Sequence, residues 1–141
     1  MIKKIRTTDL VITAILVGLI WTIQVVHYPT FNFIDEGNYK NFQVFHMNAI
    51  TPLVAPLMIL EMLLFSLSIK FHFYEKKIYY LIFFFLLSSI WLCTALVSVP
   101  LHNSLMQGKD PTAIAKLIST NWIRTICWSL KLILMIIWQK E

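Results

Sequence analysis

The sequence has 141 residues, of which 58% are apolar and only 13% are charged, and its formal net charge is +5. A water-soluble domain carries roughly 25% charged and about 45–50% apolar residues, so this composition excludes most soluble folds. Three glycines, five prolines and two isolated cysteines also exclude a low-complexity chain and a disulfide scaffold. We therefore predict a single all-α domain, residues 1–141, built as a four-helix transmembrane bundle.

A membrane-spanning helix needs about 20 predominantly apolar residues. Four segments meet this requirement: 10–28, 49–69, 79–99 and 118–138. We expect the first to be retained as a helix, because no small-x-small cleavage site follows it. Pro29 and Pro100 are predicted to end the first and third spans. Asp110 and Pro111 form a favourable N-cap and first turn, so the fourth helix is predicted to begin at Pro111 and to reach about Gln139.

The distribution of Lys and Arg predicts the orientation of the bundle, because positive residues stay on the cytoplasmic side. Seven of them lie at one set of helix ends: Lys3, Lys4, Arg6, Lys70, Lys76, Lys77 and Lys140. Three lie at the opposite ends: Lys40, Lys109 and Lys116. We predict a multi-pass cell-membrane protein with both termini in the cytoplasm and with membrane lipids as partners. No stripe of basic and aromatic residues faces water, so no nucleic-acid partner is expected.

Polar residues that are costly in lipid collect near the outer ends of all four predicted spans. They are Gln24, His27, His46, Asn48, His102, Asn103, Asn121 and Arg124. Convergent polar groups between the helices of a bundle are a usual place for a ligand or a cofactor. We therefore predict a pocket in the outer leaflet. The alternative is that each residue is an ordinary interfacial residue, wetted by lipid headgroups.

Two charged residues lie deeper, at roughly 17–20 Å from the outer surface for a rise of 1.5 Å per residue. These are Glu61 in the second span and Lys131 in the fourth. A buried charge without a partner is costly in hydrocarbon, so we expect an ion pair between them. Alternatively, Lys131 extends to the cytoplasmic surface and leaves Glu61 protonated or bound to a ligand.

The histidines allow several kinds of cofactor site. His27, His46 and His102 come from three helices and would suit a transition metal such as Zn, Cu or Fe. A b-type haem is an alternative, with His27 and either His46 or His102 as its axial ligands. In these interpretations Gln24 and Glu61 are further candidate cofactor-binding residues.

Catalysis without a metal is also open. His102 would act as acid or base, while Asn121 and Arg124 would polarise an oxygen of a small lipophilic molecule that enters from the lipid. Phosphate-binding glycine loops and a serine nucleophile motif are absent from the sequence, which argues against nucleotide and serine-hydrolase chemistry.

Two segments resemble a known family. Val99-Pro100-Leu101-His102-Asn103-Ser104-Leu105 and Asn121-Trp122-Ile123-Arg124-Thr125 resemble the closing half of the anthrone oxygenase-like family of small four-helix membrane proteins. There a V-P-L-N-x-x-L segment ends the third span, and an N-x-x-R-T or H-x-x-R-T segment opens the fourth. The element Gln24-Val25-Val26-His27-Tyr28-Pro29 resembles a Q-x-x-H-Y-P motif of an uncharacterised bacterial group.

This resemblance implies a catalytic site formed by His102, Asn103, Asn121 and Arg124, and oxidation of an aromatic or quinone-like lipophile. The leading hypothesis is thus an oxidoreductase or oxygenase-like membrane enzyme that acts on a small lipophilic substrate. The alternative is a noncatalytic haem-, metal- or lipid-binding accessory subunit. A homo-oligomer and a partner in a membrane complex both stay open.

Overall fold

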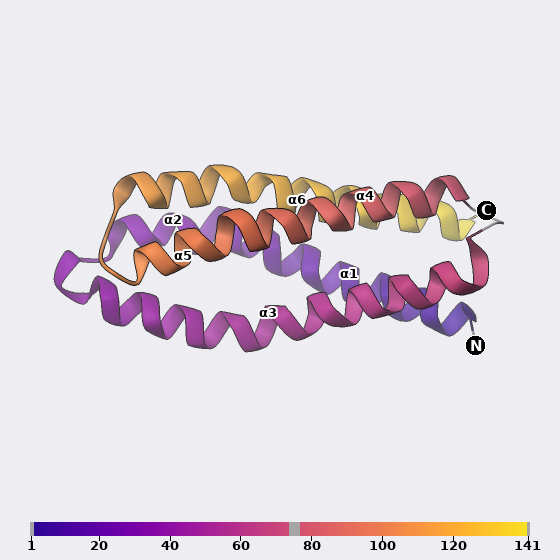
Figure 1. Ribbon diagram of the computed structural model, residues 1–141, viewed down its shortest axis with the longest axis horizontal. Coiled ribbons are helices and arrows are strands. Elements are labelled where there is room, and N and C mark those ends of the chain that lie inside the picture. Colours follow the sequence, from indigo (N-terminus) through magenta and orange to yellow (C-terminus); the bar gives the residue numbers. More distant parts are fainter. Residues whose placement is uncertain (1, 74–76, 141) are drawn as a thin grey trace.

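The computed structural model describes residues 2–73 and 77–140, with residues 2, 3, 72, 139 and 140 described by their backbone alone. Within these ranges every regular element is helical, and four helical segments are long and apolar enough to cross a membrane. The four segments run antiparallel to their chain neighbours in one elongated bundle (Figure 1). The predicted all-α fold with four apolar spans is confirmed.

The first and third segments are each composed of several helical pieces. The first consists of α1 (Ile2–Thr22), the π-helical turn η1 (Ile23–His27), α2 (Tyr28–Thr30) and the 3₁₀ turn η2 (Phe31–Phe33). The third consists of α4 (Lys77–Cys93), the π-helical turn η3 (Thr94–Ser98) and α5 (Val99–Leu105). The second and fourth are single helices, α3 (Glu36–His72) and α6 (Pro111–Lys140).

The prediction that Pro29 and Pro100 end their spans is wrong. Each proline lies just after a π-helical turn, and the helix continues past it into α2 or α5. Proline has no N–H, and its ring clashes with the carbonyl four residues earlier, here that of Val25 or Leu96. Both carbonyls lie inside the π turns, where the wider winding takes up the clash. Continuing the helix is favoured in lipid, because no water is present to bind free backbone groups.

The second helix extends well before the predicted second span, 49–69. Helix α3 begins at Glu36, directly after Asp35, whose backbone is extended (φ −62°, ψ 145°). Gln43 and His46, which the prediction left outside the span, therefore lie one turn apart on a buried face of this helix. The start of α6 is confirmed at Pro111. The Asp110 carboxylate accepts the backbone N–H groups of the second and third residues of α6 at 2.8 and 3.2 Å, as an N-cap should.

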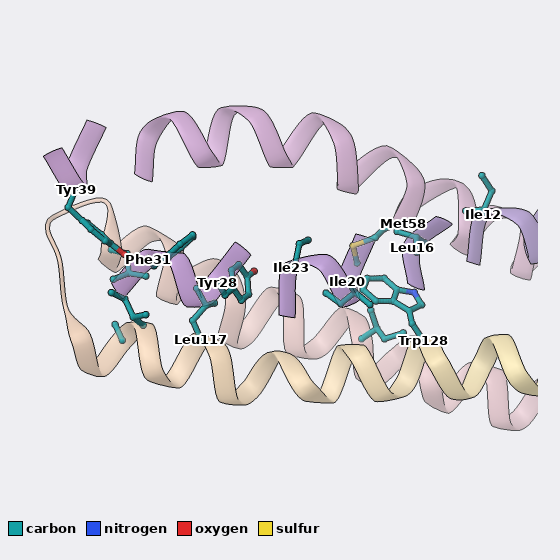
Figure 2. Packing of buried hydrophobic residues seen from close by; sticks show 14 of the residues in the cluster. Ile12, Leu16, Ile20, Ile23, Tyr28, Phe31, Tyr39, Met58, Leu117 and Trp128 are labelled. Carbon is teal, nitrogen blue, oxygen red and sulfur yellow. The ribbon is translucent and has the colours of Figure 1, made fainter. Parts of the chain in front are cut away.

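Packing is uneven around the bundle. Helix α1 packs against both α3 and α6, and α4 packs against α6, whereas α3 makes few contacts with α4 and α5. The core follows α1 and its continuation along the axis of the bundle, from Leu16 and Ile20 to Phe31, with Leu117 and Trp128 of α6 against it (Figure 2). Large apolar side chains also cover the outside, which is compatible with a surface that faces lipid. The least closed side of the bundle is thus the one between α3 and the α4–α5 segment.

The helix ends that carry most of the positive charge lie together. Helix α1 begins, α3 ends, α4 begins and α6 ends at the same end of the bundle (Figure 1). Of the residues used to predict orientation, Lys76 and the side chains of Lys3 and Lys140 lie outside the described residues. The remaining four of that set, Lys4, Arg6, Lys70 and Lys77, are at this end.

Candidate functional site

Three histidines from three segments meet near the end of the bundle opposite the chain termini. We call His27 of η1, His46 of α3 and His102 of α5 the histidine cluster. The Nε2 atom of His27 lies 2.8 Å from Nδ1 of His46, and the ring centroids of His46 and His102 are 5.0 Å apart. The structure therefore brings together the three histidines that the sequence singled out.

His102 is held by two residues that sequence reasoning missed as site residues. Its Nδ1 lies 2.9 Å from Nε2 of Gln43, and its Nε2 lies 3.0 Å from the hydroxyl of Tyr28. Nε2 of Gln43 also lies 3.4 Å from the backbone carbonyl oxygen of His102. A carbonyl oxygen only accepts, so this amide atom is the NH₂ group of Gln43 and donates. Nδ1 of His102 is then an acceptor, and a neutral His102 carries its proton on Nε2 and donates it to Tyr28. The phenolic proton of Tyr28 stays available for another acceptor.

This arrangement does not show the predicted metal site. A metal bound at about 2.0–2.1 Å from two ring nitrogens would hold them more than about 3 Å apart, whereas His27 and His46 share a direct hydrogen bond of 2.8 Å. Both ring nitrogens of His102 face protein partners. Among the described residues, no group of three His, Cys, Asp or Glu side chains is placed to hold a metal ion. In this structure the histidines are joined by hydrogen bonds, and the buried Nε2 of His46 has no partner among the described residues.

A second polar group joins the first and last spans beside the histidines. We call it the amide–arginine cluster; it comprises Gln24, Asn121, Arg124 and Thr125, all of them buried. The Gln24 side-chain oxygen accepts from Nδ2 of Asn121 at 2.9 Å, and Arg124 Nη1 donates to Oδ1 of Asn121 at 3.3 Å. Gln24 also donates to the carbonyl of Ile118 at 3.1 Å. These bonds orient Arg124, whose buried Nε has no hydrogen-bond partner among the described residues.

Other predicted site residues are not in these clusters. Asn48 and Asn103 are exposed. Glu61 lies away from the histidines, so its predicted place beside a histidine-bound cofactor is not supported. The predicted ion pair of Glu61 with Lys131 is present at 2.7 Å between Oε1 and Nζ.

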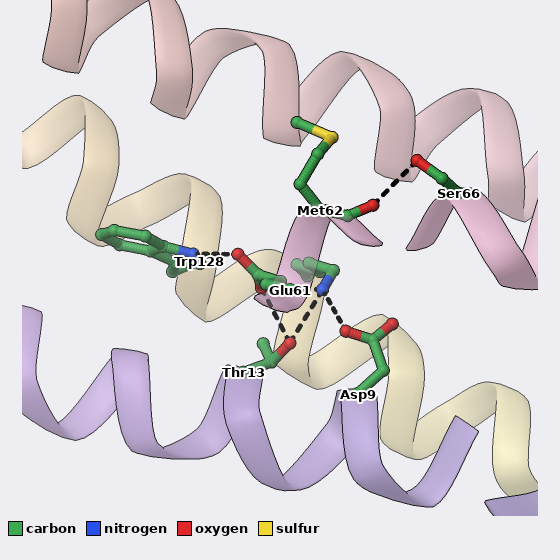
Figure 3. A network of polar contacts seen from close by, with 7 residues as sticks. Asp9, Thr13, Glu61, Met62, Ser66 and Trp128 are labelled. Carbon is green, nitrogen blue, oxygen red and sulfur yellow. Dashed lines mark hydrogen bonds and ion pairs between the residues drawn. The ribbon is translucent and has the colours of Figure 1, made fainter. Parts of the chain in front are cut away.

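That ion pair belongs to a larger buried ion network, shown in Figure 3, which joins α1, α3 and α6. Its members are Asp9, Thr13, Glu61, Trp128 and Lys131, each at most 5% exposed. Lys131 Nζ also donates to Asp9 at 3.0 Å and to Thr13 at 2.8 Å. Glu61 further accepts from the Thr13 hydroxyl at 2.9 Å and from the Trp128 indole at 3.0 Å. Asp9 escaped prediction because it precedes the first apolar segment by one residue.

A partly open cavity of about 150 Å³ connects the two clusters. The apolar wall of this cavity comes mainly from α3. We call it the lateral cavity, because it lies on the side of the bundle where α3 makes few contacts with α4 and α5. Its polar lining includes Tyr28, His102, Ser98 and Arg124. Ser98 Oγ and Arg124 Nε are buried, and neither has a hydrogen-bond partner in the described part of the chain. A second cavity of about 170 Å³ lies beside His27 and His46 and is otherwise lined by apolar residues.

Two sequence signals could have identified the missed residues. Tyr28 adjoins His27 in the Q-x-x-H-Y-P element. Gln43 is three residues before His46, which places both on one face once the segment is helical.

No protein-family model, no curated protein and no solved structure matches the chain. The resemblance to the anthrone oxygenase-like family therefore stays a prediction.

Proposed function

We propose that this chain is a multi-pass membrane protein that binds a small lipophilic molecule through an oxygen atom in the lateral cavity. The observation that carries the proposal is the pair of buried, unpartnered polar atoms, Arg124 Nε and Ser98 Oγ, on the same cavity as Tyr28 and His102. Burying a polar group without a partner costs about 1–3 kcal/mol, so a ligand that supplies the missing acceptor gains affinity there. A mostly apolar cleft with a few convergent polar groups is the usual form of a small-molecule site.

The chemistry of the lining favours a hydrogen-bond acceptor on the ligand. The Arg124 guanidinium carries only donors, and the proton arrangement at His102 leaves the Tyr28 hydroxyl free to donate. A cavity of about 150 Å³ accommodates a benzene ring. A ring with a carbonyl or anionic oxygen therefore suits the site, and an attached alkyl chain would leave between α3 and the α4–α5 segment toward lipid.

The same geometry supports proton transfer to the bound oxygen. Tyr28 would donate its phenolic proton, while the Nε2–H of His102, 3.0 Å away, would stabilise the phenolate that remains. His102 thus acts behind Tyr28 rather than as the first acid, the role predicted for it. Oxidation of the substrate, which the family resemblance implies, would further need an electron acceptor such as O₂, and it stays a prediction.

We place the lateral cavity in the outer leaflet, with both termini in the cytoplasm. The support for this orientation is the excess of Lys and Arg at the end where α1 begins. The histidine cluster and the lateral cavity lie toward the opposite end. The site would then be reached from the outer half of the lipid bilayer.

Ligand binding is tested with two probes that share a decyl chain and a flat six-membered carbon ring, decylbenzoquinone with two carbonyl oxygens and decylbenzene with none, titrated into the protein in lipid nanodiscs. We expect the quinone to bind at least about tenfold more tightly, because one lost hydrogen bond of about 1.4 kcal/mol already changes affinity tenfold. Ala55→Phe places a ring in the cavity and should abolish quinone binding. Ala14→Phe, the same change at an exposed position of α1, is the matched control. Equal binding of both probes, or unchanged binding to the Ala55→Phe variant, would refute the proposal.

A further inference from the structure

The buried ion network holds two carboxylates around one ammonium group. Asp9 Oδ1 and Glu61 Oε1 lie 3.0 and 2.7 Å from the same Lys131 Nζ. With both carboxyls ionised, these three residues carry a net charge of −1 at a place where all three are at most 5% exposed. An uncompensated charge is costly in such surroundings, and two carboxylates that share a site commonly retain one proton between them.

The hydrogen bonds distinguish the two carboxyl groups. Glu61 accepts from Lys131, Thr13 and Trp128, so both of its oxygens are used as an ionised carboxylate would use them. The hydrogen bond of Asp9 with Lys131 is made by a single oxygen, Oδ1. Glu61 is therefore the stable counter-ion of Lys131, and Asp9 is the group that is able to hold the proton.

Asp9 also has a route to one end of the bundle. It lines a small cavity of about 10 Å³ together with Arg6, Ser68 and Tyr80, which is close to the room that one water molecule needs. Asp9 lies roughly 10 Å from the start of α1 at 1.5 Å per residue. The charged and titratable groups that face it are Arg6 of α1, Glu61 of α3, Tyr80 of α4 and Lys131 of α6. The Arg6 guanidinium lies 3.9 Å from the centre of the Trp138 ring and forms no ion pair with Asp9.

The route ends on the other side of the network. The contact of Glu61 toward the lateral cavity is the indole N–H of Trp128, 3.0 Å from Oε2. An indole N–H donates a hydrogen bond but has no lone pair to accept a proton. Beyond it, Arg124 lies over the Trp128 ring at 5.4 Å and remains a cation. A proton is thus able to enter at Asp9 but finds no acceptor that leads onward.

We propose that Asp9, Glu61 and Lys131 form a proton-binding site that exchanges one proton with the end of the bundle where α1 begins. The proton forms an O–H bond with the Asp9 carboxylate and leaves the site neutral, with Glu61 and Lys131 as the ion pair. Its release returns the network to a charge of −1. This site is separate from the lateral cavity and does not depend on the ligand proposed there.

Infrared spectroscopy of the protein in nanodiscs tests the site through the C=O stretching band of a protonated carboxyl group. We expect this band near neutral pH in the wild type, with a shift in D₂O and a loss at higher pH. Asp9→Asn should remove it, and Glu61→Gln should also remove it, because Asp9 then becomes the only counter-ion of Lys131. Asp35→Asn, the same change at an exposed carboxylate without a side-chain capping bond, should leave the band intact.

Two results would overturn the proposal: no such band in the folded wild type near neutral pH, or a band there that persists in the Asp9→Asn variant. The first result depends only on the wild-type spectrum, so it can be obtained even if a variant fails to fold. Circular dichroism shows whether each variant is folded. Proteoliposomes that enclose a pH-sensitive dye test the one-sided route. We expect a proton leak equal to that of empty vesicles, and a leak that Asp9→Asn abolishes would contradict the closed end at Trp128.

Discussion

Replacement of Lys131 by methionine tests the buried ion network most severely. The variant loses three hydrogen bonds of Nζ, at 2.7, 2.8 and 3.0 Å, and leaves Glu61 with only Thr13 and Trp128 as donors. Removing one partner of a buried ion pair costs about 3–5 kcal/mol, because the remaining charge is uncompensated. We expect a loss of this size in the free energy of unfolding. Lys116→Met, at an exposed position of the same helix, should change it by less than about 0.5 kcal/mol.

The coupling between the two charges is measured by a double-mutant cycle with Glu61→Gln. Glutamine keeps an acceptor for Trp128 and removes the charge, so Lys131→Met should cost less in this background. We expect a coupling free energy of about 1–3 kcal/mol, from unfolding in mixed micelles followed by circular dichroism. If Lys131→Met costs the same in both backgrounds, the two residues are not coupled and the network does not stabilise the bundle as described.

Three further predictions concern the lateral cavity and the orientation of the chain. Tyr28→Phe removes the hydrogen bond to His102, so it should cost about 0.5–1.5 kcal/mol of stability and weaken quinone binding. Asn103→Ala should change neither stability nor binding. A loss of quinone binding in the Asn103→Ala variant would contradict the site. Pro100→Ala restores an N–H donor and favours regular α-helical turns in place of η3. We therefore expect weaker quinone binding in calorimetry, even if the melting temperature rises. An unchanged affinity would show that the π turn does not position His102. A cysteine at Gln107 should react with an impermeant thiol reagent only from outside the cell and one at Lys70 only from the cytoplasm, and the reverse pattern would overturn the orientation.

The sequence predicted the membrane-like composition, the four spans and the depth at which Glu61 meets Lys131, because these depend on hydropathy and on helix rise alone. The start of α6 was also predicted, from the Asp110 N-cap and Pro111, but the other helix bounds could not be obtained in this way. Pro29 and Pro100 break helices in water, but in lipid the cost of free backbone groups favours a π turn and continuation. Asn103 was placed in the site because of the family resemblance and its depth, neither of which shows the face on which it lies, and it is exposed.

The sequence predicted which histidines form the candidate site, but it did not predict how they are hydrogen-bonded. Four helices contributing polar groups at one depth indicated the convergence of His27, His46 and His102. The hydrogen bonds of His102 depend on Gln43, which lies outside the predicted spans, and on Tyr28, for which the sequence indicated no role. Asp9 was missed for a similar reason, because the sequence does not show that α1 turns it toward Lys131.

The central claim, that a lipophile binds in the lateral cavity, is tested most directly by photo-crosslinking with an azide-bearing decylbenzoquinone and mapping of the adducts by mass spectrometry. The predicted adducts lie on the cavity lining, at Met47, Met58 and Val99, and disappear in the Ala55→Phe variant. Adducts confined to the second cavity, at Phe45 and its neighbours, or spread evenly over the lipid-facing surface, would contradict the claim.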